Sequence, residues 1–162
     1  MRHLQKPQIS TEDILNDCVA SYRKETRDGI KNRLHVSISV ICDESRIYDE
    51  EASRHNWSAF QPHTMVNKTL SKEDMCDIYD SRFVKVERIK NKYYDHLMSL
   101  ANTGKCPICG IGQASTLDHY LAKTIYPTYA VTPYNLVPVC IIKITSANRI
   151  CYAMQPGIIL IT

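Results

Sequence analysis

The sequence predicts an α+β fold in which a mainly helical region, residues 1–103, is followed by a small metal-binding module, residues 104–162. Three observations support this division. Apolar residues recur at helical spacing up to about residue 100, a cysteine pair follows the glycine at position 104, and five prolines beyond it lie among short apolar stretches. Prolines distributed among short apolar stretches are more typical of short strands and turns than of long helices.

Two serines indicate the starts of helices. Ser10 and Ser71 are each followed within three residues by acidic side chains, a pattern typical of helix caps. The first helix continues through Leu15 and Tyr22, and the second is short. The stretch between residues 56 and 69 contains a proline and mixed polar residues, so it is predicted to be a loop.

Between these two helices, a further helix is predicted over residues 30–41, where Ile30, Leu34, Ile38 and Ile41 recur at spacings of four, four and three. The run from 36 to 40 also alternates with period two, which leaves a strand open there. We favour the helix.

The last helix of the N-terminal region is predicted from Phe83 to Leu100, because apolar residues recur there at three and four positions. It ends near Gly104, since glycine readily adopts the left-handed conformation of a C-terminal cap. This helix leads the chain directly into the cysteine pair.

Charge is distributed unevenly along the chain. Residues 1–100 hold 16 Lys/Arg and 16 Asp/Glu, whereas residues 101–162 hold four basic residues and one acidic residue. A basic cluster over residues 82–92 lies just upstream of this excess. Both patches would suit a phosphate backbone, although on charge alone a solvated helix face is the favoured interpretation.

The composition is that of an ordinary soluble protein, with 44% apolar and 23% charged residues. The chain has no apolar run long enough to span a membrane, and its start lacks the apolar segment of a signal peptide. We therefore expect a cytoplasmic protein that neither spans a membrane nor is secreted. Its helical N-terminal region is a candidate surface for a protein partner.

The seven cysteines are better explained by metal binding and burial than by disulfides, given the absence of a secretory signal. Cys18, Cys42 and Cys76 stand among apolar neighbours and are predicted to be core residues. Cys106 and Cys109, followed by a glycine, form half of a zinc knuckle. Redox motifs share this spacing, but they normally open a helix after a strand.

The motifs downstream of residue 104 resemble the HNH nuclease family, in the branch whose ββα-metal module is stapled by cysteine pairs. The resemblance rests on C-P-I-C-G at 106–110, L-D-H-Y at 117–120, Y-P at 126–127 and N-L-V-P-V-C at 135–140, which occur in this order at compatible spacing. It covers about residues 104–140. Each piece alone is weak, whereas the ordered set is specific.

The resemblance implies catalytic roles for three residues. Asp118 would bind the catalytic Mg²⁺ or Mn²⁺, His119 would be the general base that activates water, and Asn135 would tie the hairpin loop and orient the histidine. These roles make chemical sense, because a carboxylate suits a hard cation and an imidazole can accept a proton near neutral pH. Adjacent strand residues point to opposite sides, so we expect a bend or bulge at 118–119.

The resemblance also implies a structural Zn²⁺ site with Cys106, Cys109 and Cys140 as three ligands. The family pattern calls for a further cysteine at position 143, where this chain has a lysine. Cys151 is a candidate fourth ligand, and Asn148 a candidate replacement for the missing catalytic metal ligand. The module is therefore predicted to be incomplete at its C-terminus.

The tail, residues 141–162, has an atypical composition, because β-branched and apolar residues stand where a charged amphipathic helix is expected. We interpret it as the product of a truncated or frame-shifted gene. An incomplete zinc site would weaken the folding of so small a module.

The leading prediction is a metal-dependent HNH-type endonuclease that hydrolyses phosphodiester bonds in DNA, impaired by its incomplete C-terminus. The alternative is a zinc-knuckle module that binds nucleic acid without cutting it. A third reading is a helical interaction protein without zinc. Members of this family often belong to bacterial defence or mobile-element systems, which the resemblance alone implies here.

Overall fold

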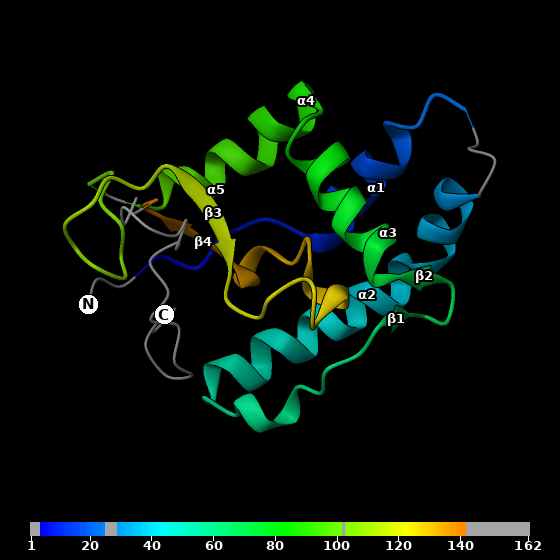
Figure 1. Cartoon of the computed structure of the whole chain (residues 1–162), viewed down its shortest axis with the longest axis horizontal. Coiled ribbons are helices and arrows are strands. Elements are labelled where there is room, and N and C mark those ends of the chain that lie inside the picture. Colours follow the sequence, from blue (N-terminus) through cyan, green and yellow to red (C-terminus); the bar gives the residue numbers. More distant parts are fainter. Residues whose placement is uncertain (1–3, 25–28, 102, 142–162) are drawn as a thin grey trace, which may run out of the picture.

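The computed structural model describes residues 4–24, 29–101 and 103–141. Helices form most of the first hundred residues, and a two-stranded sheet follows them, so the predicted α+β class is confirmed (Figure 1). The predicted tail after Ile141, with Cys151 and Asn148, lies outside the described residues. Within the described part, no helix combines the length and apolar character needed to cross a bilayer.

The first two helices are α1, Thr11–Ala20, and α2, Ile30–Ser53. The Ser10 hydroxyl accepts hydrogen bonds from the backbone N–H groups of Glu12 and Asp13, which confirms the predicted cap of α1. The region 30–41 is helical, and the strand alternative is wrong, because α2 buries a face with helical period against α1.

The predicted loop at 56–69 contains more structure than expected. It holds a 3₁₀ turn, η1 (Trp57–Ala59), and strand β1 (Met65–Val66), which pairs antiparallel with β2 (Leu70–Ser71). Asn67 and Lys68 form the tight turn of this hairpin with positive φ angles of 48° and 56°. Such short strands leave almost no periodic signal in the sequence.

The predicted single helix from Phe83 to Leu100 is wrong at its start. Phe83 ends the preceding helix, which consists of α3 (Lys72–Asp77) and the wider π-type turns of η2 (Ile78–Phe83). The backbone is extended at Val86, and a new helix then runs through α4 (Glu87–Ile89), η3 (Lys90–Tyr94) and α5 (Asp95–Ser99). Because both helices bury apolar residues in the same core, their apolar spacing runs on across the break.

The C-terminal part of the described chain is the hairpin of β3 (Thr116–His119) and β4 (Leu136–Val139), which pair antiparallel with Leu117 opposite Pro138 and His119 opposite Leu136. Two 3₁₀ turns, η4 (Pro127–Tyr129) and η5 (Pro133–Asn135), lie in the long connection between the strands. Helix α5 packs against both strands.

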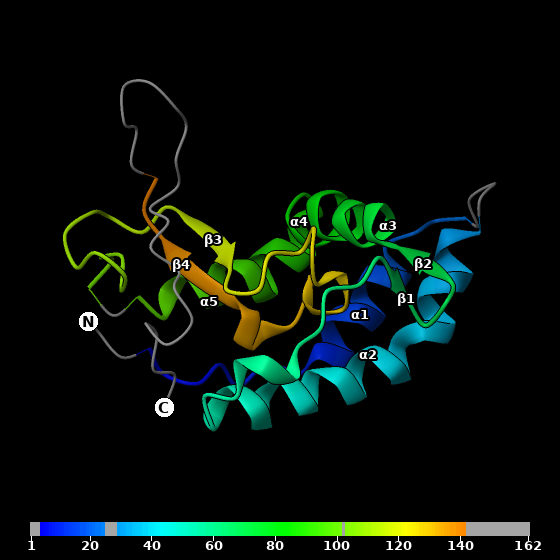
Figure 2. The same ribbon diagram turned by 60° about the horizontal axis from the view of Figure 1, so that its bottom comes forward.

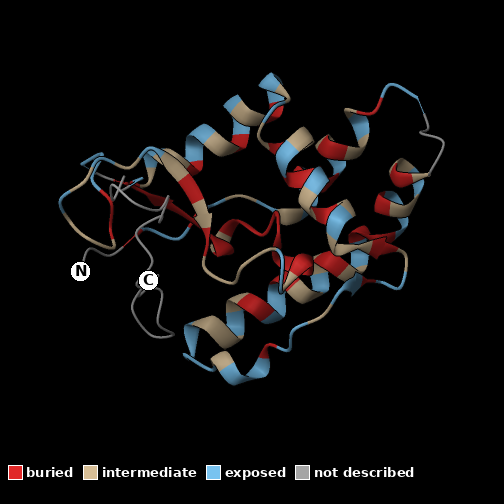
Figure 3. Cartoon of the chain, viewed as in Figure 1, coloured by how far each residue is buried: buried red, intermediate tan, exposed pale blue. Residues whose placement is uncertain are grey.

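The helical region and the hairpin share one hydrophobic core (Figure 3). The largest buried cluster contains Leu15, Leu34 and Phe83 from the helices together with Leu117 and Leu136 from the hairpin. The segment before α1 also reaches the hairpin, since Leu4 packs with Val137 and Val139 (Figure 2). Residues on both sides of position 104 are therefore buried together.

The cap of α3 allows a test of this fold. Ser71 and Asp74 form a capping box in which each side chain accepts a hydrogen bond from the other's backbone N–H. Ser71→Ala should lower the free energy of unfolding by about 1 kcal/mol, measured by urea denaturation. Ser99→Ala, at an exposed helix end, should change it by less than about 0.5 kcal/mol, and equal effects would contradict the capping role.

Candidate functional site

Strand β3 presents Asp118 and His119 on opposite faces of the hairpin. His119 lies on the buried face and is 6% exposed, whereas Asp118 lies on the half-buried face. The register with β4 is one to one through both residues, so the bulge expected at 118–119 does not occur. The chain bends only after the strand, at Tyr120 and Leu121, so the bend predicted at 118–119 does not occur either, and the two side chains keep the opposite orientations of a regular strand.

Hydrogen bonding fixes the tautomer of the His119 ring. Its Nε2 lies 2.9 Å from the backbone oxygen of Ala130, and a carbonyl can only accept, so Nε2 carries the proton. In the neutral ring, Nδ1 is then the atom with the free lone pair, and it has no hydrogen-bond partner among the described residues. The Tyr79 ring packs edge-on against the imidazole, with 4.5 Å between the ring centroids.

Burial of His119 lowers the pKa of its imidazole to about 4, which keeps the ring neutral at pH 7. Burial also raises the pKa of the neighbouring Asp118 carboxyl, against the opposing effects of the His119 backbone N–H and of Lys123. Asp118 Oδ1 accepts that N–H at 2.8 Å, which orients the carboxylate beside the strand.

Lys123 and Tyr79 belong to the surroundings of this pair, and sequence reasoning did not single them out. The ammonium of Lys123 lies 4.4 Å from the centre of the Tyr79 ring and 2.5 Å from Asp80 Oδ1. Tyr79 and Asp80 come from η2, far from the hairpin in sequence, so no local motif could have indicated them.

Asn135 ties the connection between the two strands. Its Nδ2 donates to the backbone oxygens of Leu121 and Tyr129, both at 3.0 Å, and its Oδ1 accepts the Leu121 N–H at 2.7 Å. The hydroxyl of Tyr48 also donates to Oδ1, at 3.2 Å. The amide is fully buried, so these four bonds satisfy both of its hydrogens and its oxygen.

The three cysteines predicted as zinc ligands come together at the far end of the hairpin. The sulfur atoms of Cys106, Cys109 and Cys140 all lie within 4.8 Å of one another, and those of Cys109 and Cys140 are 3.5 Å apart. Zinc–sulfur bonds of about 2.3 Å in a tetrahedron place the sulfurs about 3.8 Å apart, so the cluster fits a zinc ion. Cys18 is buried and Cys42 and Cys76 are partly buried, away from this cluster.

Two glycines shape the turn that carries the first two thiols. Gly110 has a positive φ of 70°, and its N–H donates to the Cys106 oxygen at 2.8 Å. Gly112 passes so close to Cys140 that an added Cβ would lie 2.8 Å from both Cβ and Sγ of that cysteine. The Gly112 N–H points at Cys109 Sγ, at 3.4 Å, and backbone N–H groups lower the pKa of this thiol to about 7.

Asp118 and His119 do not form a complete divalent-metal site with other described residues. In the described part of the chain, the three cysteines are the only group of three or more His, Cys, Asp or Glu side chains close enough to share an ion. Asp118 offers a hard oxygen ligand, and it belongs to no such group of three among the described residues.

The basic cluster over residues 82–92 is partly neutralised within the fold. Arg88 and Lys92 both pair with Asp17, at 2.9 and 3.0 Å, and Lys90 pairs with Asp95 at 2.7 Å. The side chains of Arg88 and Lys92 stay more than half exposed, but they share a carboxylate that a phosphate would have to displace.

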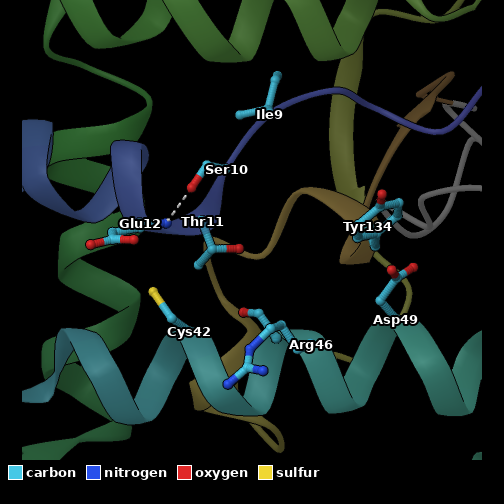
Figure 4. A pocket seen from close by; sticks show the side chains of 9 residues that line it. Ile9, Ser10, Thr11, Glu12, Cys42, Arg46, Asp49 and Tyr134 are labelled. Atoms are coloured by element: carbon cyan, nitrogen blue, oxygen red, sulfur yellow. Dashed lines mark hydrogen bonds between the residues drawn. The ribbon is translucent and has the colours of Figure 1, made fainter.

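A surface pocket of about 280 Å³ opens elsewhere, between the start of α1, helix α2 and Tyr134 (Figure 4). Two of its charged side chains have partners, since Arg46 pairs with Asp43 and Asp49 pairs with Lys6. Neither Asp118 nor His119 lines it, so this pocket does not belong to the candidate active site.

Comparison with known proteins gives a limited result. No protein-family model matches the sequence, and no solved structure matches it. The sequence is similar to Protein ea31 of Escherichia phage lambda, with 36% identity over 81 residues, which make up 49% of this chain and 27% of that protein. The chain therefore matches about a quarter of this relative, whose name states no activity.

The buried imidazole predicts a pH dependence of stability. Because the folded pKa of His119 is about 4 and its usual value is 6.5, the unfolded chain binds a proton between these values that the folded chain does not. This part of the stability is complete above pH 6.5 and is lost as the pH falls towards 4. Wild type should lose up to about 3 kcal/mol more than His119→Gln over this interval, at about 1.4 kcal/mol per pH unit.

Urea denaturation of both proteins at several pH values measures this difference. Glutamine keeps an N–H that can donate to the Ala130 oxygen and removes the titrating ring, so it is the matched variant. Identical pH dependence of the two proteins would contradict a neutral, buried His119.

The close approach of Gly112 to Cys140 predicts an effect on metal content. The purified protein should contain about one zinc ion per chain, and Gly112→Ala should lower this content because its methyl group would displace the Cys140 side chain. Gly110→Asn is the control, since asparagine tolerates positive φ and the space there is open. Elemental analysis decides, and equal zinc in wild type and Gly112→Ala would argue against the site.

Proposed function

We propose that this chain is a metal-dependent nuclease of the HNH type, which hydrolyses phosphodiester bonds in DNA. His119 acts as the general base, Asp118 holds Mg²⁺ or Mn²⁺, and Asn135 keeps the loop that orients His119. Cys106, Cys109 and Cys140 hold a structural Zn²⁺.

The observation that carries this proposal is the hydrogen bond from His119 Nε2 to the Ala130 oxygen. It directs the lone pair of the neutral ring to Nδ1, the state that a general base requires. When Nδ1 takes a proton from water, the Nε2–H bond to the carbonyl stabilises the imidazolium that forms. The carboxylate of the preceding residue, Asp118, supplies a ligand for a hard cation.

A bound Mg²⁺ or Mn²⁺ would neutralise charge on the phosphate during hydrolysis. The chain itself contributes orientation: Asp118 is held by the His119 N–H, and the loop around His119 is held by Asn135. The zinc site would fix the end of β4 and thus the frame of the hairpin.

A second function is favoured by a specific observation. The described residues provide ligands for a structural ion but not a complete site for a catalytic one. A zinc-knuckle module that binds nucleic acid without cleaving it would need only the cysteine cluster. This candidate differs from the first in predicting binding that is independent of His119.

Nicking of supercoiled plasmid DNA in Mg²⁺ or Mn²⁺ tests the proposal. Replacing a general base typically reduces the rate by about 10²–10⁴-fold, so His119→Gln should abolish nearly all nicking. His96→Gln, on the exposed face of α5, is the control and should nick like wild type. Equal nicking by wild type and His119→Gln would remove the catalytic role, and DNA binding without nicking would support the second function.

A further inference from the structure

One face of helix α2 is bonded to the connection between β3 and β4. Tyr129 donates its hydroxyl proton to Glu44 at 3.1 Å, and the hydroxyls of Ser45 and Thr132 are 2.7 Å apart. Tyr48, one turn further along α2, donates to Asn135 Oδ1. Residues three and four apart share one side of a helix, so this face of α2 follows the connection over several residues.

The bond from Tyr48 continues towards His119 through a short series of contacts. Asn135, which accepts the Tyr48 proton, donates to the backbone oxygen of Tyr129. The next residue is Ala130, whose backbone oxygen accepts the Nε2–H of His119. The carbonyl that fixes the tautomer of His119 is therefore one peptide unit from a carbonyl that Asn135 holds.

We propose that Tyr48 is a positioning residue, which keeps the Ala130 carbonyl aligned with His119 Nε2 by holding Asn135. This inference rests on the proposed function, because positioning has a catalytic consequence only if His119 is the base. The structural part of the inference stands independently, since it concerns the tautomer of the ring.

The burial of Tyr48 supports this role. The side chain is 1% exposed, and its ring packs against Phe60 and Tyr129 with centroid distances of 5.2 and 5.1 Å. A buried hydroxyl that loses its acceptor raises the free energy of the folded state, so the Tyr48 hydroxyl keeps its hydrogen bond to Asn135 Oδ1. The rigid ring stack holds that hydroxyl in one place, and it also fixes Tyr129, beside Ala130.

Tyr48→Phe separates positioning from packing, because it removes the hydroxyl and keeps the ring. The tautomer of His119 is read from the ¹⁵N resonances of the imidazole at neutral pH. Wild type should show the proton on Nε2 alone, and Tyr48→Phe should show a second population with the proton on Nδ1. In the plasmid assay, kcat should fall about fivefold, as expected for one neutral hydrogen bond that acts on the transition state, with KM unchanged.

Tyr126→Phe is the matched control. Tyr126 belongs to the same aromatic cluster, and its hydroxyl has no hydrogen-bond partner among the described residues. This variant should keep the wild-type tautomer and kcat. Ser45→Ala gives an independent second test, and it should act like Tyr48→Phe in direction because it releases the same connection at Thr132.

The outcomes separate the two proposals. A wild-type tautomer and kcat in both Tyr48→Phe and Ser45→Ala would overturn the positioning role, even if wild type cleaves DNA. A changed tautomer in these variants, with no cleavage by wild type, would uphold the positioning role and reject the proposed function. A changed tautomer with reduced kcat would support both.

Discussion

The buried amide of Asn135 is the contact on which the candidate site depends. It joins the end of β3, the 3₁₀ turn at Tyr129 and helix α2 through four hydrogen bonds. These bonds are directional, and a buried polar group left without its partner costs about 1–3 kcal/mol. The connection between the strands therefore has one favoured arrangement, in which the Ala130 carbonyl meets the ring of His119.

Strand β4 is held at both of its ends by chemically different contacts. Asn135 precedes the strand and Cys140 follows it, in the cluster that fits a zinc ion. The amide network fixes the side near His119, and the thiols fix the turn at residues 106–112. A sheet of two short strands buries too little apolar surface to be stable alone, so contacts at both ends of β4 are needed to hold it in place.

The helical region supports the hairpin rather than standing apart from it. Helix α2 bonds to the connection, α5 packs on both strands, and Leu4 covers the far side of β4. The sequence suggested that this region could hold a protein partner, and that remains a prediction. What the contacts show is that one face of α2 is already occupied by the chain itself.

The sequence by itself determined the α+β class, the serine caps, the helical character of residues 30–41 and the cysteine cluster, because each depends on residues that are close in sequence or on a specific ligand chemistry. Only the tertiary structure decided that His119 is buried and bonded to Ala130, and that Tyr48, Tyr79 and Lys123 lie around the site. The contacts of Tyr48 and Tyr79 join segments tens of residues apart, and the bond between His119 and Ala130 spans 11 residues of irregular chain. Apolar spacing in the sequence indicates that such residues are buried but not which partner they contact. The sequence did not predict the helix break at Val86, because the helices on both sides of it bury apolar residues in one common core.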